Sequence, residues 1–118
     1  MNRTRPLSVR FFCTATGREP VREWLRGLAR ESKKVIGEDI KTVQLGWPIG
    51  MPVVRKLDRD LWEVRSTLSN SIARVMFTVH EGMVVLLHGF IKKSQQTPKR
   101  DLNLSLDRLQ TLQSEQEP

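Results

Sequence analysis

The residues of this sequence best suited to chemistry are cations set in and around one apolar stretch. Arg65 and Arg74 each stand among apolar residues, Lys92-Lys93 close the stretch, and Lys56 precedes it. A guanidinium group matches two phosphate oxygens with parallel donors, and an ammonium group adds a compact positive charge. Together these residue types predict a site for a phosphate group.

Other kinds of catalytic site are disfavoured by the same sequence. The two histidines, His80 and His88, lack metal-ligand spacing, and the acidic residues near them are scattered singly. No serine stands in a nucleophile elbow, and there is no glycine-rich phosphate loop. We therefore predict no metal site and no cofactor.

Cations without a metal suit phosphodiester transfer within RNA, because the 2′-hydroxyl of the substrate is itself the nucleophile. Preorganised donors facing the phosphorane oxygens can each contribute roughly 3–4 kcal/mol of transition-state stabilisation. A lysine or histidine whose pKa is lowered by neighbouring cations could act as general base or acid. The plainer alternative is that the two arginines are solvated, or paired with Glu63.

The charge distribution favours an anionic partner. The net charge is +7, and residues 41–100 carry ten Lys or Arg against four Asp or Glu. Such a surface suits a nucleic acid, an acidic protein or a lipid surface, although simple solubility would also account for it. Cys13 is the only cysteine, which excludes an internal disulfide and fits a reducing cytosol. No segment approaches the length of a membrane span, so we expect a cytoplasmic protein.

The stretch Leu61–Lys93 has the pattern of a three-stranded antiparallel meander. A two-residue turn at Asn70-Ser71 would place Arg65 opposite Met76, with Arg74 diagonal to Arg65 on the same face. Most bulky apolar residues of this hairpin fall on the other face. A four-residue loop would give the same division, whereas a bulge would break it.

A second turn at Glu81-Gly82 would pair Val79 with Val84 and Phe77 with Leu86. This register places His88 on the apolar face, as a hydrogen-bonded core residue. The last strand is apolar on both faces, which is typical of a central buried strand.

The other elements complete an α+β fold: an N-terminal strand, a helical hairpin packed on a mainly antiparallel sheet, and a C-terminal helix. We expect one domain over residues 1–113, followed by a polar tail at 114–118. The expected elements are a strand at Leu7–Ala15, helices from Pro20 and from about Ser32 to Gly46, a strand at Val53–Leu57, and a helix at Pro98–Gln113.

Three segments of the chain resemble a known family. They read LWEVR from Leu61, ARVMF from Ala73, and LHGFIKKSQQTP from Leu87. This order is similar to that of the HigB-like branch of the RelE/ParE toxin superfamily, a group also described as phage-derived toxin-like proteins. Its typical pattern is L-W-E-[LV]-R, then R-[VI]-x-[FY], then L-L-H-x-F-x-K-K-x-x-x-T-P.

The resemblance implies a RelE-like fold and the toxin of a type II toxin–antitoxin system. Such a toxin cleaves mRNA without a metal, often on the ribosome, and so inhibits translation. Its partner would be a helix-turn-helix antitoxin. Two alternatives remain: a ParE-like toxin that poisons DNA gyrase through protein contact, and a protein that binds RNA without cutting it.

Position by position, the resemblance also assigns roles. Arg65 and Arg74 match the phosphate-binding arginines, and Lys92 and Lys93 match the basic pair that follows the aromatic Phe90. Phe90 would support the substrate or stack on it.

Two positions in the family pattern are less fixed. Lys56 is a weaker match for a substrate-binding residue. Since this chain has no tyrosine, which some superfamily members use near the end of the last strand, the proton donor is open among Lys93, Lys92 and His88.

Overall fold

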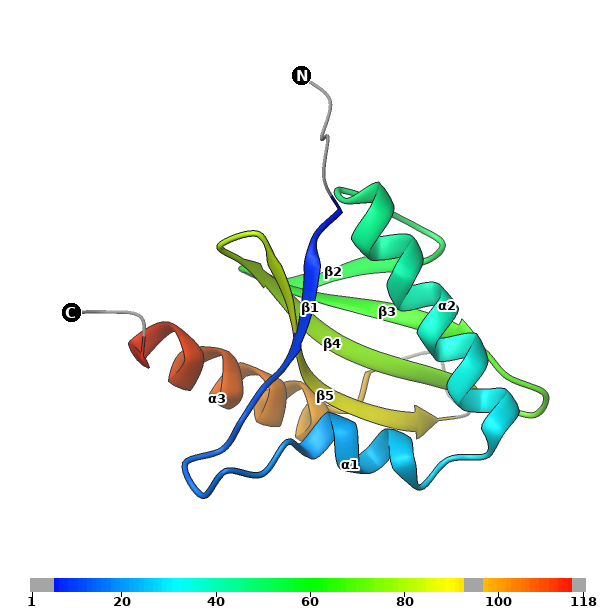
Figure 1. The fold of residues 1–118 in the computed structure, drawn as a ribbon, viewed down its shortest axis with the longest axis horizontal. Coiled ribbons are helices and arrows are strands. Elements are labelled where there is room, and N and C mark those ends of the chain that lie inside the picture. Colours follow the sequence, from blue (N-terminus) through cyan, green and yellow to red (C-terminus); the bar gives the residue numbers. More distant parts are fainter. Residues whose placement is uncertain (1–5, 93–96, 116–118) are drawn as a thin grey trace.

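The computed structural model describes residues 6–92 and 97–115 and shows an α+β fold (Figure 1). This confirms the predicted fold class. The elements are β1 (Ser8–Phe11), α1 (Pro20–Arg26), α2 (Arg30–Gly46), β2 (Val54–Asp58), β3 (Leu61–Thr67), β4 (Ile72–His80), β5 (Met83–Lys92) and α3 (Lys99–Glu115).

One five-stranded sheet runs through the molecule in the order β1-β5-β4-β3-β2. β1 is parallel to β5, and all the other neighbours are antiparallel. β5 thus lies inside the sheet, as its apolar faces predict. The β4–β5 turn is Glu81-Gly82, with positive φ angles of 50° and 76°. Two such residues in succession are typical of tight hairpin turns.

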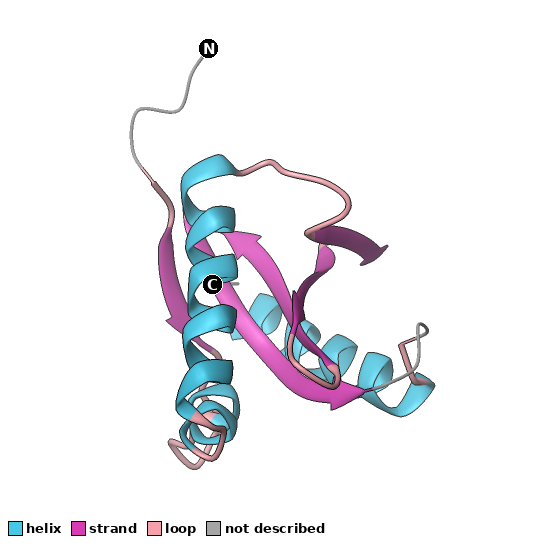
Figure 2. Cartoon of the chain, turned by 90° about the vertical axis from the view of Figure 1, so that its right-hand side faces the viewer, coloured by secondary structure: helices cyan, strands magenta, loops and turns pink. Residues whose placement is uncertain are grey.

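Helices cover both faces of the sheet (Figure 2). On one face, α1 and α2 pack over a core that includes Ile36, Val43 and Phe77. On the other, α3 packs through Leu109 and Leu112 against residues from the middle of the sheet. We call these the α2 face and the α3 face. No helix in residues 6–92 and 97–115 is long and apolar enough to cross a membrane.

The first hairpin has a longer loop than predicted. Thr67 pairs with Ile72, and the Leu68 N–H donates to the Ser71 carbonyl at 2.9 Å, closing a four-residue loop. The two-residue turn was therefore wrong, and Arg65 lies directly opposite Arg74 rather than opposite Met76. Each residue of β3 therefore pairs with a β4 residue two positions earlier than predicted. A shift of two residues leaves every side chain on its predicted face, so both arginines still share one face.

The second hairpin starts in the predicted register and then breaks at a bulge. Phe77 pairs with Leu86, but the preceding residue, Met76, pairs with His88, which leaves Leu87 as the extra residue. Beyond the bulge every side chain of β5 changes face. The prediction that His88 lies on the same face as Phe77 was therefore wrong, and His88 lies on the α3 face.

Gly89 accounts for the position of this bulge. The change of face directs Gly89 toward α1, where Trp24 packs as part of the core, as its place in the apolar stripe predicts. A Cβ atom on Gly89 would overlap the six-membered ring of Trp24. The indole occupies the space of the missing side chain.

Candidate functional site

Register places four of the predicted residues on the α3 face at one end of the sheet. Arg65 pairs with Arg74, and Arg74 pairs with Phe90 on the other side. The next row ends in Lys92, which pairs with Ile72. Lys93 lies outside the described residues.

Arg74 is fully buried within a polar network. Its Nη1 donates to the two carboxylate oxygens of Glu63, at 3.3 and 3.4 Å, and neither side chain is exposed. Thr97, just before α3, accepts from the same Nη1 at 3.4 Å and donates to Glu63 Oε2 at 2.8 Å. For Arg74, the alternative of pairing with Glu63 is therefore confirmed.

This network changes what Arg74 can do at the site. A buried charge is tolerated only with a well-placed partner, and Glu63 supplies one. In this arrangement Arg74 presents no surface to a phosphate. It ties β3 and β4 to Thr97, and so to the beginning of α3.

Arg65 and Lys92 are accessible cations at this end of the sheet. Arg65 is half-buried and Lys92 is exposed. Two like charges directly across a strand pair repel each other. Glu63 balances the charge of Arg74 and so reduces this repulsion.

His88 anchors α3 rather than facing the site. Its Nε2 lies 2.7 Å from Asp101 Oδ1, and Arg108 Nη1 lies 3.5 Å from its Nδ1 and donates to the Leu87 carbonyl at 2.8 Å. A guanidinium group only donates, so Nδ1 is assigned as the acceptor and Nε2 as the protonated nitrogen. Both ring nitrogens are thus engaged by α3.

Burial lowers the pKa of His88, because desolvation disfavours the imidazolium ion. The hydrogen bond and charge of Asp101 oppose this shift, whereas the charges of Arg108 and Arg100 add to it. The net shift favours the neutral imidazole.

Phe90 stacks on this histidine. The ring centroids of His88 and Phe90 are 5.6 Å apart and their planes make an angle of 22°. Phe90 is half-buried, next to Arg74 in the sheet. The aromatic ring therefore has a fixed position beside the cations.

Arg55, rather than the predicted Lys56, lies on the α3 face. Lys56 pairs with Trp62, and its Nζ lies 5.9 Å from the centroid of the Trp62 ring, on the α2 face. Arg55 instead opposes Glu63 and lines a cavity of about 290 Å³ together with Thr97. Sequence reasoning missed Arg55, because a regular register counted back from the Arg59-Asp60 turn places Lys56 opposite Glu63, whereas a bulge between Lys56 and Asp58 shifts the pairing by one residue.

The sequence was also compared with known protein families. Residues 23–110 match the family described as Phage derived protein Gp49-like (DUF891). The chain belongs to this family. The Gp49-like family is one of RelE/HigB-like toxins in toxin–antitoxin systems. The matched region extends from α1 into α3 and contains the whole candidate site. A search among proteins with curated descriptions found no significant match.

Proposed function

We propose that this Gp49-like protein is the toxin of a type II toxin–antitoxin system, of the HigB-like branch, and that it is a metal-independent mRNA endoribonuclease acting on the ribosome. The observation that carries the proposal is the register that brings Arg65 and Lys92 to one end of the α3 face. Family membership supports it. Its partners are then mRNA and a helix-turn-helix antitoxin.

In the proposed reaction the 2′-hydroxyl of one nucleotide attacks the adjacent phosphorus. The bond from phosphorus to the 5′-oxygen breaks, leaving a 2′,3′-cyclic phosphate and a 5′-hydroxyl. Arg65 donates to the non-bridging oxygens as charge develops on them, and Lys92 adds a second positive charge. Such groups act without reorganising during the reaction.

The attacking 2′-hydroxyl must lose a proton and the leaving 5′-oxygen must gain one. We assign both transfers to the pair Lys92 and Lys93, one lysine accepting a proton in its neutral form and the other donating one as the ammonium ion, because both ring nitrogens of His88 are engaged by α3. His88 then acts on the substrate only through Phe90, which it supports.

Arg55 and Arg74 take different parts. Arg55 is exposed on the same face and is the candidate for a neighbouring phosphate of the RNA. Arg74, with Glu63 and Thr97, holds the strands and the beginning of α3 in place.

The test is RNA cleavage by purified protein on translating ribosomes, mapped by primer extension. We expect Arg65→Ala to lower the cleavage rate by roughly 10²–10³-fold, the usual effect of removing one oxyanion donor. Arg59→Ala is the matched control, since Arg59 is exposed in the β2–β3 turn. Its cleavage rate should equal that of the wild type.

Three outcomes would contradict the proposal. Full cleavage by the Arg65→Ala protein would remove the phosphate role of Arg65. Intact transcripts together with a DNA damage response would favour a ParE-like gyrase poison. Salt-sensitive RNA binding without cleavage products would favour a non-enzymatic binder.

A further inference from the structure

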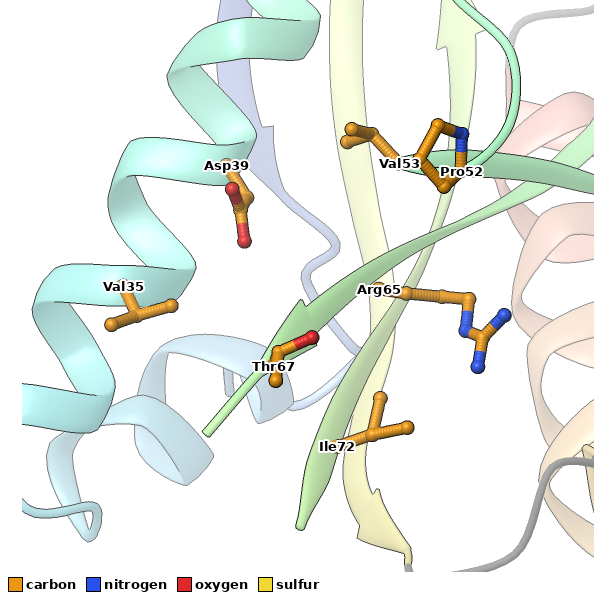
Figure 3. Close-up of a pocket in the computed structure, with 7 residues that line it drawn as sticks. All are labelled: Val35, Asp39, Pro52, Val53, Arg65, Thr67 and Ile72. Carbon is orange, nitrogen blue, oxygen red and sulfur yellow. The ribbon is translucent and has the colours of Figure 1, made fainter. Parts of the chain in front are cut away.

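The free edge at the end of β3 borders a cavity beside the candidate site. The pairing of β2 with β3 reaches Val54 and Val64, and beyond it the Val53 carbonyl accepts from the Arg65 N–H at 3.0 Å. β3 continues to Thr67 past the beginning of β2. A cavity of about 470 Å³ lies there, between α2, the loop before β2 and the end of β3 (Figure 3).

The walls of this cavity are mostly aliphatic, with polar groups at distinct places. Its lining residues are Val35, Asp39, Pro52, Val53, Arg65, Thr67 and Ile72. The aliphatic residues come from α2, from the loop and from β4, so they surround the space on several sides (Figure 3). The flat ring faces of a nucleobase can be held between such walls.

Asp39 is the acidic group of this cavity. It lies one helical turn after Val35, and its carboxylate points into the space between α2 and β3 (Figure 3). It is half-buried, and within residues 6–92 and 97–115 no hydrogen bond or ion pair joins it to another side chain. A partly desolvated carboxylate is stabilised by N–H donors, so a ligand that brings them would be favoured.

The backbone of Thr67 adds a donor and an acceptor. The Arg65 N–H points toward the β2 side of β3, because Val53 accepts it. Backbone groups of a strand alternate in direction, so Thr67, two residues later, directs its N–H and C=O to the same side. There they face the cavity past the end of β2.

We propose that this cavity binds a guanine base of the RNA, next to the phosphate held by Arg65. Guanine is the one RNA base whose Watson–Crick edge presents two adjacent N–H donors, at N1 and N2, and these match the two oxygens of the Asp39 carboxylate. Adenine, cytosine and uracil each offer a single donor group on that edge. The inference rests on the proposed function and adds a base preference to it.

The arrangement of the two charged residues fits one nucleotide. The guanidinium group of Arg65 points away from Asp39, toward the other side of β3 (Figure 3). A base on the α2 side and its phosphate on the α3 side would therefore straddle the free edge of β3. The anionic phosphate would meet the guanidinium group of Arg65, and the N–H donors of the neutral base would meet the carboxylate of Asp39.

The experiment compares RNA substrates that differ in one nucleotide beside the cleaved bond. Wild-type protein should cleave the guanosine substrate roughly ten- to a hundredfold faster than the others, the usual discrimination of a bidentate base contact. Asp39→Asn should remove most of this preference. Inosine, which keeps N1–H but lacks the 2-amino group, should be cleaved at an intermediate rate.

Glu38→Gln is the matched control, because Glu38 precedes Asp39 on α2 but is exposed and lies outside the cavity lining. It should keep the guanosine preference. Cleavage by the wild type without base preference, or an unchanged preference in the Asp39→Asn protein, would overturn the inference. So would weaker binding of the antitoxin by Asp39→Asn with an unchanged base preference, since an arginine of a partner protein would then be the occupant.

A binding measurement separates this inference from the proposed function. Guanosine 5′-monophosphate should bind the wild-type protein, and Asp39→Asn should weaken that binding roughly tenfold or more. If the nucleotide binds in this way but no RNA is cleaved, the endoribonuclease proposal fails while the guanine site stands. If RNA is cleaved and the nucleotide does not bind, the guanine site fails alone.

Discussion

At the scale of single residues, the most consequential feature is the buried pair of Glu63 and Arg74. Its atoms are held by charge-assisted hydrogen bonds within the protein, and Thr97 completes the set. Removing one member of a buried pair leaves the other charge uncompensated. A loss of toxicity on mutating Arg74 would therefore report on folding as much as on chemistry.

We predict that Arg74→Met lowers the free energy of unfolding by about 3–5 kcal/mol, because it strands the Glu63 carboxylate in the core. The double variant Glu63→Leu with Arg74→Met should recover most of that loss. Urea unfolding followed by circular dichroism measures both. Arg22→Ala, which breaks an exposed pair with Glu19, serves as the control and should cost less than about 1 kcal/mol. An Arg74→Met protein as stable as the wild type would contradict the structural role of the pair.

The sequence predicted which face of the sheet a side chain occupies more readily than it predicted whether that side chain is buried. The pairing of the last three strands places Arg65 and Arg74 on one face from sequence alone. The burial of Arg74 was not predictable, because it depends on Thr97, which lies far along the chain and reaches Glu63 only when α3 packs on the sheet. Arg55 was missed because a regular β2–β3 register places Lys56 on this face, and no local signal in the sequence marks the bulge between Lys56 and Asp58 that brings Arg55 there instead.

At the scale of elements, the bulge in β5 decides which side chains meet α3. A regular hairpin and a bulged one have the same pattern of apolar residues here, since β5 is apolar on both faces. Gly89 was the one local signal, and its meaning depends on Trp24, which comes from a helix distant in sequence. The predicted faces of the β5 side chains were therefore correct before the bulge and wrong after it.

We predict that Gly89→Ala destabilises the protein by about 1–3 kcal/mol, because the added methyl group overlaps the Trp24 ring and one of them must move. Thermal unfolding measures the loss. Gly37→Ala is the control, since a Cβ on this α2 residue meets no atom within 4 Å. That change should be neutral or stabilising by up to about 1 kcal/mol. Equal effects at the two glycines would mean that the indole does not fix the bulge.

The docking of α3 should depend on pH through His88. The pKa of His88 is lowered in the fold, chiefly by burial, so the unfolded chain binds a proton at a higher pH than the folded one does. Stability is then fully present above about pH 6.5, the pKa of an unperturbed histidine, and decreases as the pH falls below it. Asp101 faces the ring and opposes the shift, while Arg100 and Arg108 reinforce it.

Urea unfolding between about pH 5.5 and 7.5 tests this dependence. His88→Gln should flatten it, and His80→Gln, a change at the end of β4, should leave it in place. A wild-type protein that became more stable as the pH fell would show that the attraction of Asp101 outweighs burial.

At the scale of the whole molecule, the α+β architecture followed from periodicity and turn residues. Alternation identified the strands, and apolar residues spaced three and four apart identified the helices. The parallel placement of β1 beside β5 did not follow from these local signals, because no short-range pattern links two segments so far apart. The same holds for the candidate site. Its location on the sheet was predicted from local patterns, whereas the packing of α3 beside it was not.

The strand order also bears on how the protein is made. β1 ends at Phe11, but its partner β5 begins at Met83. The first strand to be synthesised therefore cannot pair in the sheet until the last strand has been made. The row that joins Arg65 and Arg74 to Phe90 likewise requires β5. Contacts of such long sequence separation form late in folding. We therefore expect that the cations of the α3 face are not yet assembled in a nascent chain that lacks β5. The site would then form only when synthesis of the chain is nearly complete.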